Sequence, residues 1–202
     1  MSPATSSQRL VILLHGLGGT GSMMMPIATP WRSQMPSTRF AAPDAPFASP
    51  HGGRQRFGVD GQALRPDRIS VVRRAFDELI AEIVDQEGFS NALGQVAFLG
   101  VSQGAIMALD AVASGRWKIG ALVSVAGLLP IPPIPAPTRM PVLLIHGKED
   151  QTIPAMESGA AAAQLKAAGY DVTLDIQAGV GHTISIQGAQ EARVFLKKRF
   201  LV

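Results

Sequence analysis

Six short apolar runs, separated by segments with helical periodicity, are the feature that most constrains the fold of this chain. Most of the runs are continuous rather than alternating, as expected for strands that are buried on both faces of a sheet. Strands that alternate with helices favour an α/β fold with a mostly parallel sheet and helices on both faces. The expected strands are Leu10 to Leu14, Arg39 to Ala42, Val96 to Leu99, Ala121 to Val125, Val142 to Ile145 and Val172 to Ile176.

Four helices are expected between and after these strands. The clearest has apolar residues at i, i+3 and i+4 spacing, with Asp67 as the expected N-cap, Glu87 as its end and Gly88 just beyond. The other three cover about 103–114, 155–168 and 187–200. Polar and apolar residues alternate in the last strand, which predicts one solvent-facing side and a position at the sheet edge.

Two long segments, 43–66 and 127–141, show no regular periodicity. The second reads GLLPIPPIPAPTRMP, and its prolines exclude a regular helix and favour an extended loop. Loops of this length can form binding walls or lids, or can simply cross the surface. The sequence leaves both interpretations open.

Length and composition limit the class of protein. A chain of 202 residues can bury one sizeable core and is short for two, so we expect a single domain over 1–202. Near the N-terminus the longest aliphatic run is Leu10 to Leu14, which is too short to span a bilayer and has no export signal before it. We therefore expect a cytoplasmic protein without stable membrane insertion. The absence of cysteine excludes disulfides, thiolate catalysis and cysteine-ligated metal.

The charge pattern does not favour a nucleic-acid partner. The net charge is only +3, from 18 basic and 15 acidic residues, and there is no lysine-rich block. The densest basic cluster is expected to be a solvated helix face and loop, because a nucleic-acid surface normally shows a broader basic stripe. It contains Arg54, Arg56, Arg65, Arg68, Arg73 and Arg74.

The stretch GVSQG, residues 100–104, lies where the third expected strand passes into a helix. A serine at the tip of a sharp strand-to-helix turn projects from the fold, and flanking glycines remove Cβ atoms that would collide there. The pattern alone is a weak signal because glycine and serine are common residues. Ser102 becomes a candidate nucleophile only if a base and an acid lie nearby.

Three histidines follow strands and therefore compete as the base. His182 lies in a glycine-rich turn after the last strand, which can carry its imidazole over neighbouring strands. His15 and His146 close strands directly, where a ring is more often a structural hydrogen-bonding group, and His51 lies in the first irregular segment. We favour His182.

Asp150 is the favoured third member, because it follows the strand that ends near Ile145. It could instead be a turn or helix-cap aspartate. Glu149 is the adjacent alternative, whereas Asp175 falls on the solvent-facing side of the last strand. The chain order serine, aspartate, histidine is the order of an α/β-hydrolase triad.

Acyl transfer also requires N–H donors for the oxyanion, and loss of one donor typically costs about 3 to 4 kcal/mol. One donor is expected to be the backbone N–H of Gln103, at the start of the helix. The second is assigned to the backbone N–H of Leu17, in the glycine-rich loop after the first strand.

The same loop also matches a competing motif. Gly16, Gly18 and Gly21 have the spacing of a dinucleotide fingerprint, and Asp44 follows the next strand, where a ribose-binding acid could lie. A regular helix from the end of the motif is not expected, because Pro26 and Pro30 interrupt it. The only tyrosine, Tyr170, also has no lysine four residues later.

Taken together, these segments resemble the phospholipase/carboxylesterase family, the bacterial carboxylesterase and acyl-protein thioesterase branch of the α/β-hydrolases. The matching pieces are LLHGLGGTG at 13–21, APDAP at 42–46, GVSQG at 100–104, HGKEDQTIP at 146–154 and GVGHTIS around His182. They occur in the family's order and cover nearly the whole chain.

The resemblance implies an α/β-hydrolase fold and a serine esterase, possibly acting on thioesters, whose substrate is a small ester or an acylated molecule. It implies Ser102 as nucleophile, Asp150 as orienting acid and His182 as base, with no metal or cofactor, and it makes His146 a structural residue. Three features depart from the family pattern: Gly19 in place of aspartate, Arg56 and Phe57 in place of a Trp-Phe pair, and no leading strand.

An apolar pocket for the substrate is expected beside the serine, because flexible thioethers fit varied acyl chains. Ordinary core or lid packing explains the same residues equally well, and a catalytically idle binding protein stays an alternative. The oligomeric state is left open. The candidate pocket residues are Met23, Met24, Met25, Leu64 and Leu128.

Overall fold

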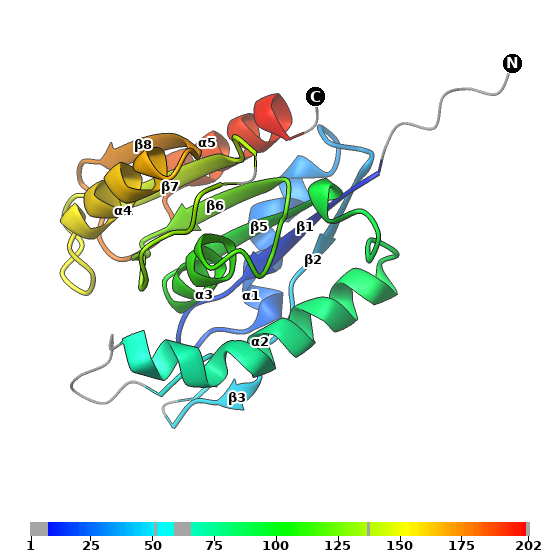
Figure 1. The fold of residues 1–202 in the computed structure, drawn as a ribbon, viewed down its shortest axis with the longest axis horizontal. Helices are drawn as coiled ribbons and strands as arrows, with labels where there is room; N and C mark the ends of the chain where they lie inside the picture. The colour runs from blue at the N-terminus through cyan, green and yellow to red at the C-terminus, as the bar shows by residue number, and fades with distance from the viewer. Residues whose placement is uncertain (1–7, 51, 59–65, 137, 201–202) are drawn as a thin grey trace, which may run out of the picture.

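A sheet of six parallel strands forms the centre of the computed structural model, which describes residues 8–50, 52–58, 66–136 and 138–200 (Figure 1). The strand order is β2-β1-β5-β6-β7-β8, and every neighbouring pair is parallel. All six predicted strands are confirmed. Their bounds are β1 Arg9–Leu14, β2 Thr38–Ala41, β5 Val96–Val101, β6 Ala121–Val125, β7 Pro141–Gly147 and β8 Asp171–Gln177.

Helices cover both faces of the sheet (Figure 1). On one face lie α2 Pro66–Gln86, α3 Gln103–Ala113 and α4 Met156–Ala167, and on the other α1 Gly21–Ala28, the short 3-10 helix Thr29–Trp31 and α5 Ile186–Arg199. Alternate residues of β1 point into the two apolar layers, which is why its apolar run is unbroken. The predicted helix ends are correct to within two residues, but Asp67 lies inside α2 rather than capping it.

The last strand lies at the sheet edge as predicted, but its alternation does not match its burial. Leu174 and Ile176 are 37% and 39% exposed, whereas Gln177 is buried. The apolar side of β8 faces α4, which buries Val172 near the start of the strand but leaves Leu174 and Ile176 partly uncovered. Gln177 lies on the other side of the strand, where it accepts a hydrogen bond from Ser185, the residue before α5.

The two irregular segments differ from each other. The first contains a short antiparallel pair, β3 Phe47–Ala48 with β4 Arg54–Gln55. The described residues of the second form no helix or strand before β7 begins at Pro141. No helix in the described ranges is both long enough and apolar enough to cross a membrane.

The expectation of a fully solvated arginine cluster is wrong for two of its members. Arg56 is 1% exposed, and Arg73 forms an ion pair with the buried carboxylate of Asp110. Arg74 does lie on the exposed side of α2, where it pairs with Glu78. Sequence spacing could not separate these cases, because the buried partner of Arg73 lies on α3. Arg65 and the side chain of Arg68 lie outside the described residues.

A buried carboxylate joins α2 to α3 and to the loop after α3. The Asp110 side chain is fully buried and accepts hydrogen bonds from Arg73 at 2.8 and 3.0 Å and from Arg116 at 2.9 Å. Arg116 also donates to Asp77 on α2 at 2.8 Å. The network therefore fixes α2 against α3, the helix that follows the candidate nucleophile.

Replacing Asp110 should destabilise the fold strongly, because Asp110→Ala leaves two arginines facing an apolar layer without their shared acceptor. Breaking a buried pair from one side typically costs about 3 to 5 kcal/mol. Urea unfolding followed by circular dichroism would measure the loss. As a control, Glu78→Ala removes the exposed partner of Arg74 and should leave the unfolding midpoint unchanged. Equal midpoints for the two variants would contradict this account of the network.

Candidate active site

The turn between β5 and α3 has a backbone conformation that few side chains adopt. Ser102 has φ of 53° and ψ of −120°, and it directly precedes the first residue of α3. A Cβ at Gly104 would lie 2.1 Å from the carbonyl oxygen of Leu14, and one at Gly100 would lie 2.5 Å from the nitrogen of Ala105. Glycine is therefore required at both positions, and the turn holds Ser102 at the carboxyl end of β5.

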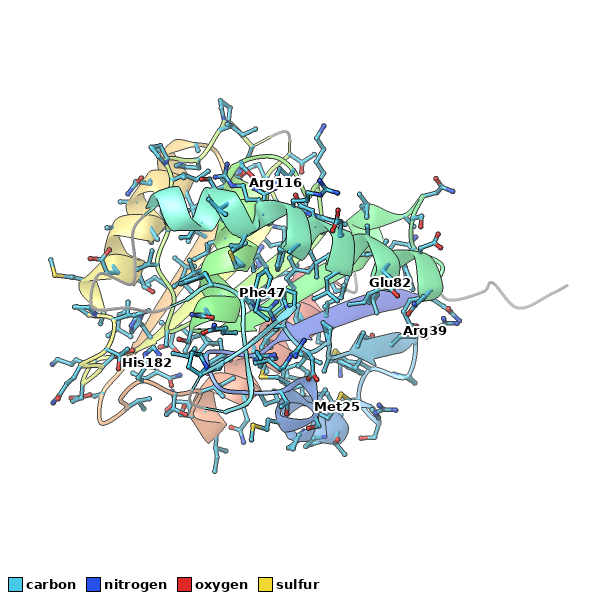
Figure 2. The ribbon with its side chains drawn as sticks, turned by 90° about the horizontal axis from the view of Figure 1, so that it is seen from below. Met25, Arg39, Phe47, Glu82, Arg116 and His182 are labelled. Atoms are coloured by element: carbon cyan, nitrogen blue, oxygen red, sulfur yellow. The ribbon has the colours of Figure 1, made fainter. Side chains whose placement is uncertain are left out.

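The structure brings Ser102, His182 and Asp150 together. His182 Nε2 lies 2.8 Å from Ser102 Oγ, and His182 Nδ1 lies 2.7 Å from Asp150 Oδ2. These side chains follow β5, β8 and β7, whose carboxyl ends meet at one edge of the sheet. Figure 2 shows His182 at one end of the molecule and Arg39 and Glu82 toward the other. The imidazole is thus positioned to exchange a proton with the serine while its other nitrogen donates to the aspartate.

The Asp150 carboxylate is held by several donors. Its Oδ1 accepts the backbone N–H groups of Thr152 and Ile153 at 2.8 and 2.9 Å, while Oδ2 faces His182. Burial acts to raise the pKa of Asp150, but the hydrogen bonds from Ile153, His182 and Thr152 outweigh it and lower the pKa overall. The favoured form of Asp150 in this site is therefore the carboxylate, which accepts a hydrogen bond from the imidazole N–H of His182.

His146 lies behind the aspartate rather than beside the serine. Its Nε2 is 3.1 Å from Asp150 Oδ2 and 2.8 Å from the carbonyl oxygen of Ile153, and its Nδ1 is 2.7 Å from Ser158 Oγ. An Nε2–H that is shared between these two oxygens leaves Nδ1 to accept the Ser158 hydroxyl. The sequence reasoning missed Ser158, because nothing in the motif HGKEDQTIP points to a residue on α4.

The other candidates for the base and the acid do not contact Ser102 or His182 in this way. His15 Nε2 accepts the backbone N–H of Ala45 at 2.8 Å, and its Nδ1 lies 2.7 Å from the carbonyl oxygen of Gly16. Burial is the main cause that lowers the pKa of His15, which favours this neutral, bonded state. Glu149 is exposed, and His51 lies outside the described residues.

The two assigned oxyanion donors lie beside the serine turn. A Cβ at Gly16 would lie 3.0 Å from Ser102 Cβ, so the loop after β1 packs directly against the serine. Leu17 follows in this loop, and Gln103 is the first residue of α3. Within the described part of the chain, neither of their backbone N–H groups donates a hydrogen bond. Both are therefore available to a ligand.

The glycine motif after β1 does not have the arrangement that a dinucleotide-binding site requires. Contrary to our expectation, α1 does begin at Gly21 and contains Pro26, since a proline late in a short helix displaces few backbone bonds. However, the backbone N–H of Gly21 donates to Asp44 Oδ1 at 2.7 Å. The acid that would bind a ribose instead occupies the helix N-terminus that would bind the pyrophosphate.

A hollow of about 480 Å³ opens over Ser102 and His182. Of the candidate pocket residues, Met23 and Met24 line it, whereas Leu128 packs in the core layer on the opposite face and Met25 packs against the layer beneath α1. Leu64 lies outside the described residues. No group of three or more potential metal ligands occurs in the ranges that the structure describes. Sequence reasoning gave no role to five other lining residues, Ile27, Val101, Thr152, Thr183 and Ile184.

Comparisons with known proteins identify the family of this chain. A family model described as Phospholipase/Carboxylesterase matches residues 1–200. Esterase YpfH of Escherichia coli (strain K12) is 32% identical over 95% of this chain and 83% of its own length. Acyl-protein thioesterase 1 of Gibberella zeae is 29% identical over 98% of this chain and 93% of its own.

The similarity extends to solved structures. The crystal structure of esterase PE8 is 32% identical and superposes with a TM-score of 0.86, covering 98% of this chain and 96% of that one. The Bacillus cereus carboxylesterase, at 18% identity and a TM-score of 0.83, shares the fold. The chain therefore belongs to the phospholipase/carboxylesterase family and has the α/β-hydrolase fold.

Proposed function

We propose that this protein is a single-domain serine hydrolase that cleaves carboxylic esters through an acyl-enzyme on Ser102. The observation that carries the proposal is the position of His182, whose two ring nitrogens lie 2.8 Å from the Ser102 hydroxyl and 2.7 Å from the Asp150 carboxylate. A serine hydroxyl becomes a useful nucleophile when a base held in this way accepts its proton.

In the first half of the reaction, His182 Nε2 accepts the proton of Ser102 while Oγ attacks the carbonyl carbon of the ester. The carbonyl oxygen becomes an oxyanion, which accepts the backbone N–H groups of Leu17 and Gln103. Asp150 stabilises the imidazolium that forms. The intermediate then collapses, and the leaving alkoxide takes its proton from His182 Nε2.

In the second half, water replaces the alcohol beside His182. The imidazole accepts a proton from this water, which attacks the acyl carbon and forms a second oxyanion in the same position. Collapse releases the carboxylic acid and returns the proton to Ser102. These steps need neither a metal ion nor an organic cofactor.

Thioesters are a second candidate substrate class, favoured by the similarity to acyl-protein thioesterases. The same steps cleave a thioester, with a thiol in place of the alcohol. Met23 and Met24 give the hollow a flexible apolar wall that suits an acyl chain. Parallel assays with an ester and a thioester of the same acyl group would give the ratio of the two activities.

Labelling with a fluorophosphonate should modify Ser102 of the wild-type protein, because the probe reacts with a serine that a neighbouring base activates. Mass mapping of the labelled peptide checks the site. Ser102→Ala and His182→Ala should abolish labelling and lower kcat for p-nitrophenyl acetate by about 10⁴-fold or more. Ser22→Ala, which alters an exposed serine on α1, is the matched control and should label normally.

A folded wild-type protein that takes no label and hydrolyses no ester would favour the idle binding protein instead. Circular dichroism of each variant separates loss of chemistry from loss of fold. Labelling of a serine other than Ser102 would overturn the assignment of the nucleophile while leaving the protein a hydrolase.

The role of Asp150 can be tested with Asp150→Asn. An amide keeps the shape of the side chain but cannot stabilise the imidazolium, so kcat should fall by about 10³ to 10⁴-fold with a small change in KM. Steady-state kinetics on p-nitrophenyl acetate would measure it. A residual activity above one tenth of the wild type would contradict an essential role for Asp150.

Stability should respond to pH through the same carboxyl. Since folding lowers the pKa of Asp150, its contribution is fully present above the unfolded value, about 3.9, and is lost as pH falls through the folded value. The difference in unfolding free energy between wild type and Asp150→Asn should therefore shrink toward acid pH. Urea unfolding of both proteins between pH 7 and pH 3 would show a constant difference if the carboxylate gave no such stabilisation.

A further inference from the structure

A second hollow, of about 440 Å³, lies between the two helices on one face of the sheet. We name it the α1–α5 groove. One wall comes from α1 and the 3-10 helix after it, and the other from the start of α5. Its lining includes Ile27 and Gln34 on the first side and Ile184, Ile186, Ala189 and Arg193 on the second.

The groove is continuous with the hollow above the serine. Ile27 and Ile184 line both of them, one from each wall. Met23, on the α1 side of the catalytic hollow, and Ile186, on the α5 side of the groove, are 67% and 83% exposed. A substrate that extends from Ser102 along this path would therefore cover apolar side chains that otherwise face water.

The far part of the groove is polar. Gln34, Gln190 and Arg193 line it, and the Arg193 guanidinium donates to the neutral side-chain oxygen of Gln34. Among the residues that the structure describes, no carboxylate forms an ion pair with Arg193. The groove therefore runs from an apolar section near the catalytic hollow to an uncompensated cation.

The position of His182, which protonates the leaving oxygen, indicates which half of the ester enters the α1–α5 groove. The leaving oxygen must lie within reach of His182 Nε2, from which it takes its proton. Thr183 and Ile184 directly follow His182 and line the catalytic hollow, and Ile184 continues into the groove. The chain attached to the leaving oxygen thus meets the groove first, whereas the acyl group is bonded to the carbonyl carbon and turns away from His182.

We propose that the α1–α5 groove binds the alcohol part of the ester, so that the preferred substrates are esters of long, unbranched alcohols with an anionic group at the far end. This inference rests on the proposed function. Ile27, Ile184 and Ala189 contact the alkyl chain, and Arg193 pairs with the anionic end.

Two isomeric esters test the assignment in the wild-type protein. Octyl acetate places its long chain on the alcohol side, and ethyl octanoate places it on the acyl side. We expect kcat/KM to be about tenfold higher for octyl acetate, because only its chain enters the groove. Equal values, or a preference for ethyl octanoate, would overturn the proposal without depending on the fold of any variant.

Blocking the groove should change the ratio of kcat/KM for octyl acetate to kcat/KM for ethyl octanoate. Ala189 lines the groove but not the hollow above the serine, so Ala189→Phe should lower the preference for octyl acetate by about tenfold. Ala163→Phe makes the same change at an exposed position on α4 and should leave the preference at the wild-type value. A loss confined to ethyl octanoate would assign the groove to the acyl chain instead.

The anionic end is tested with the acetate ester of ω-hydroxyoctanoate. Arg193→Gln should raise KM for this ester by about tenfold relative to octyl acetate, since it removes the charge and keeps a polar side chain. An unchanged KM ratio would remove Arg193 from the substrate site. Failure of the proposed function differs from all of these results, because the wild type would then hydrolyse neither isomer and would take no fluorophosphonate label.

Discussion

The close contact between α3 and the end of β1 is the constraint on which the site depends. Gly104 lies so near the carbonyl oxygen of Leu14 that a methyl group would overlap it, and this contact lets α3 begin directly after β5. The short connection forces Ser102 into a positive φ. Backbone strain of this kind persists only where the surrounding packing holds it. Here the buried strands on both sides of β5 and the Asp110 network between α2 and α3 supply that packing.

The order of strands then determines what surrounds the serine. The loop after β1 lies on one side of Ser102, and the segments after β7 and β8 lie on the other, because β1 and β6 are the neighbours of β5. No functional side chain has to cross the sheet. The histidine that follows β8 needs only a glycine-rich turn to reach back over β7 and β6. His146, whose ring is held by Ser158, contacts Asp150 from behind, so the acid has little freedom to leave the imidazole.

The parts that sequence could predict are those encoded by local pattern. Continuous apolar runs predicted the six strands, and the chain order of Ser102, Asp150 and His182 predicted residues that the structure holds within hydrogen-bond distance. The parts it could not predict depend on partners far along the chain. Arg73 was expected to be solvated because its acceptor, Asp110, lies on α3. The dinucleotide motif stayed an alternative because only the fold shows that Asp44 accepts a hydrogen bond from the backbone N–H of Gly21.

Gln103 shows how one residue can connect the site to its surroundings. Its side-chain oxygen accepts the backbone N–H of Arg56 at 3.0 Å, and its side-chain nitrogen donates to the carbonyl oxygen of Phe57 at 2.9 Å. The segment after β4 is thereby bound to the first turn of α3, while the backbone N–H of Gln103 is left for the oxyanion. The family often has a Trp-Phe pair at this segment, and here Arg56 takes the place of the tryptophan.

Arg56 is buried and brings a charge into the interior of the protein. Its guanidinium lies over the ring of Phe76, 5.8 Å from the centroid, and within the described residues none of its three nitrogens has a hydrogen-bond partner. Burial lowers the pKa of Arg56 to about 10, which reflects the cost of holding the cation there. A ring stacked on a cation recovers part of that cost. The two backbone bonds to Gln103 are independent of the side chain, so this exchange can occur without loss of the link between the segment and the serine turn.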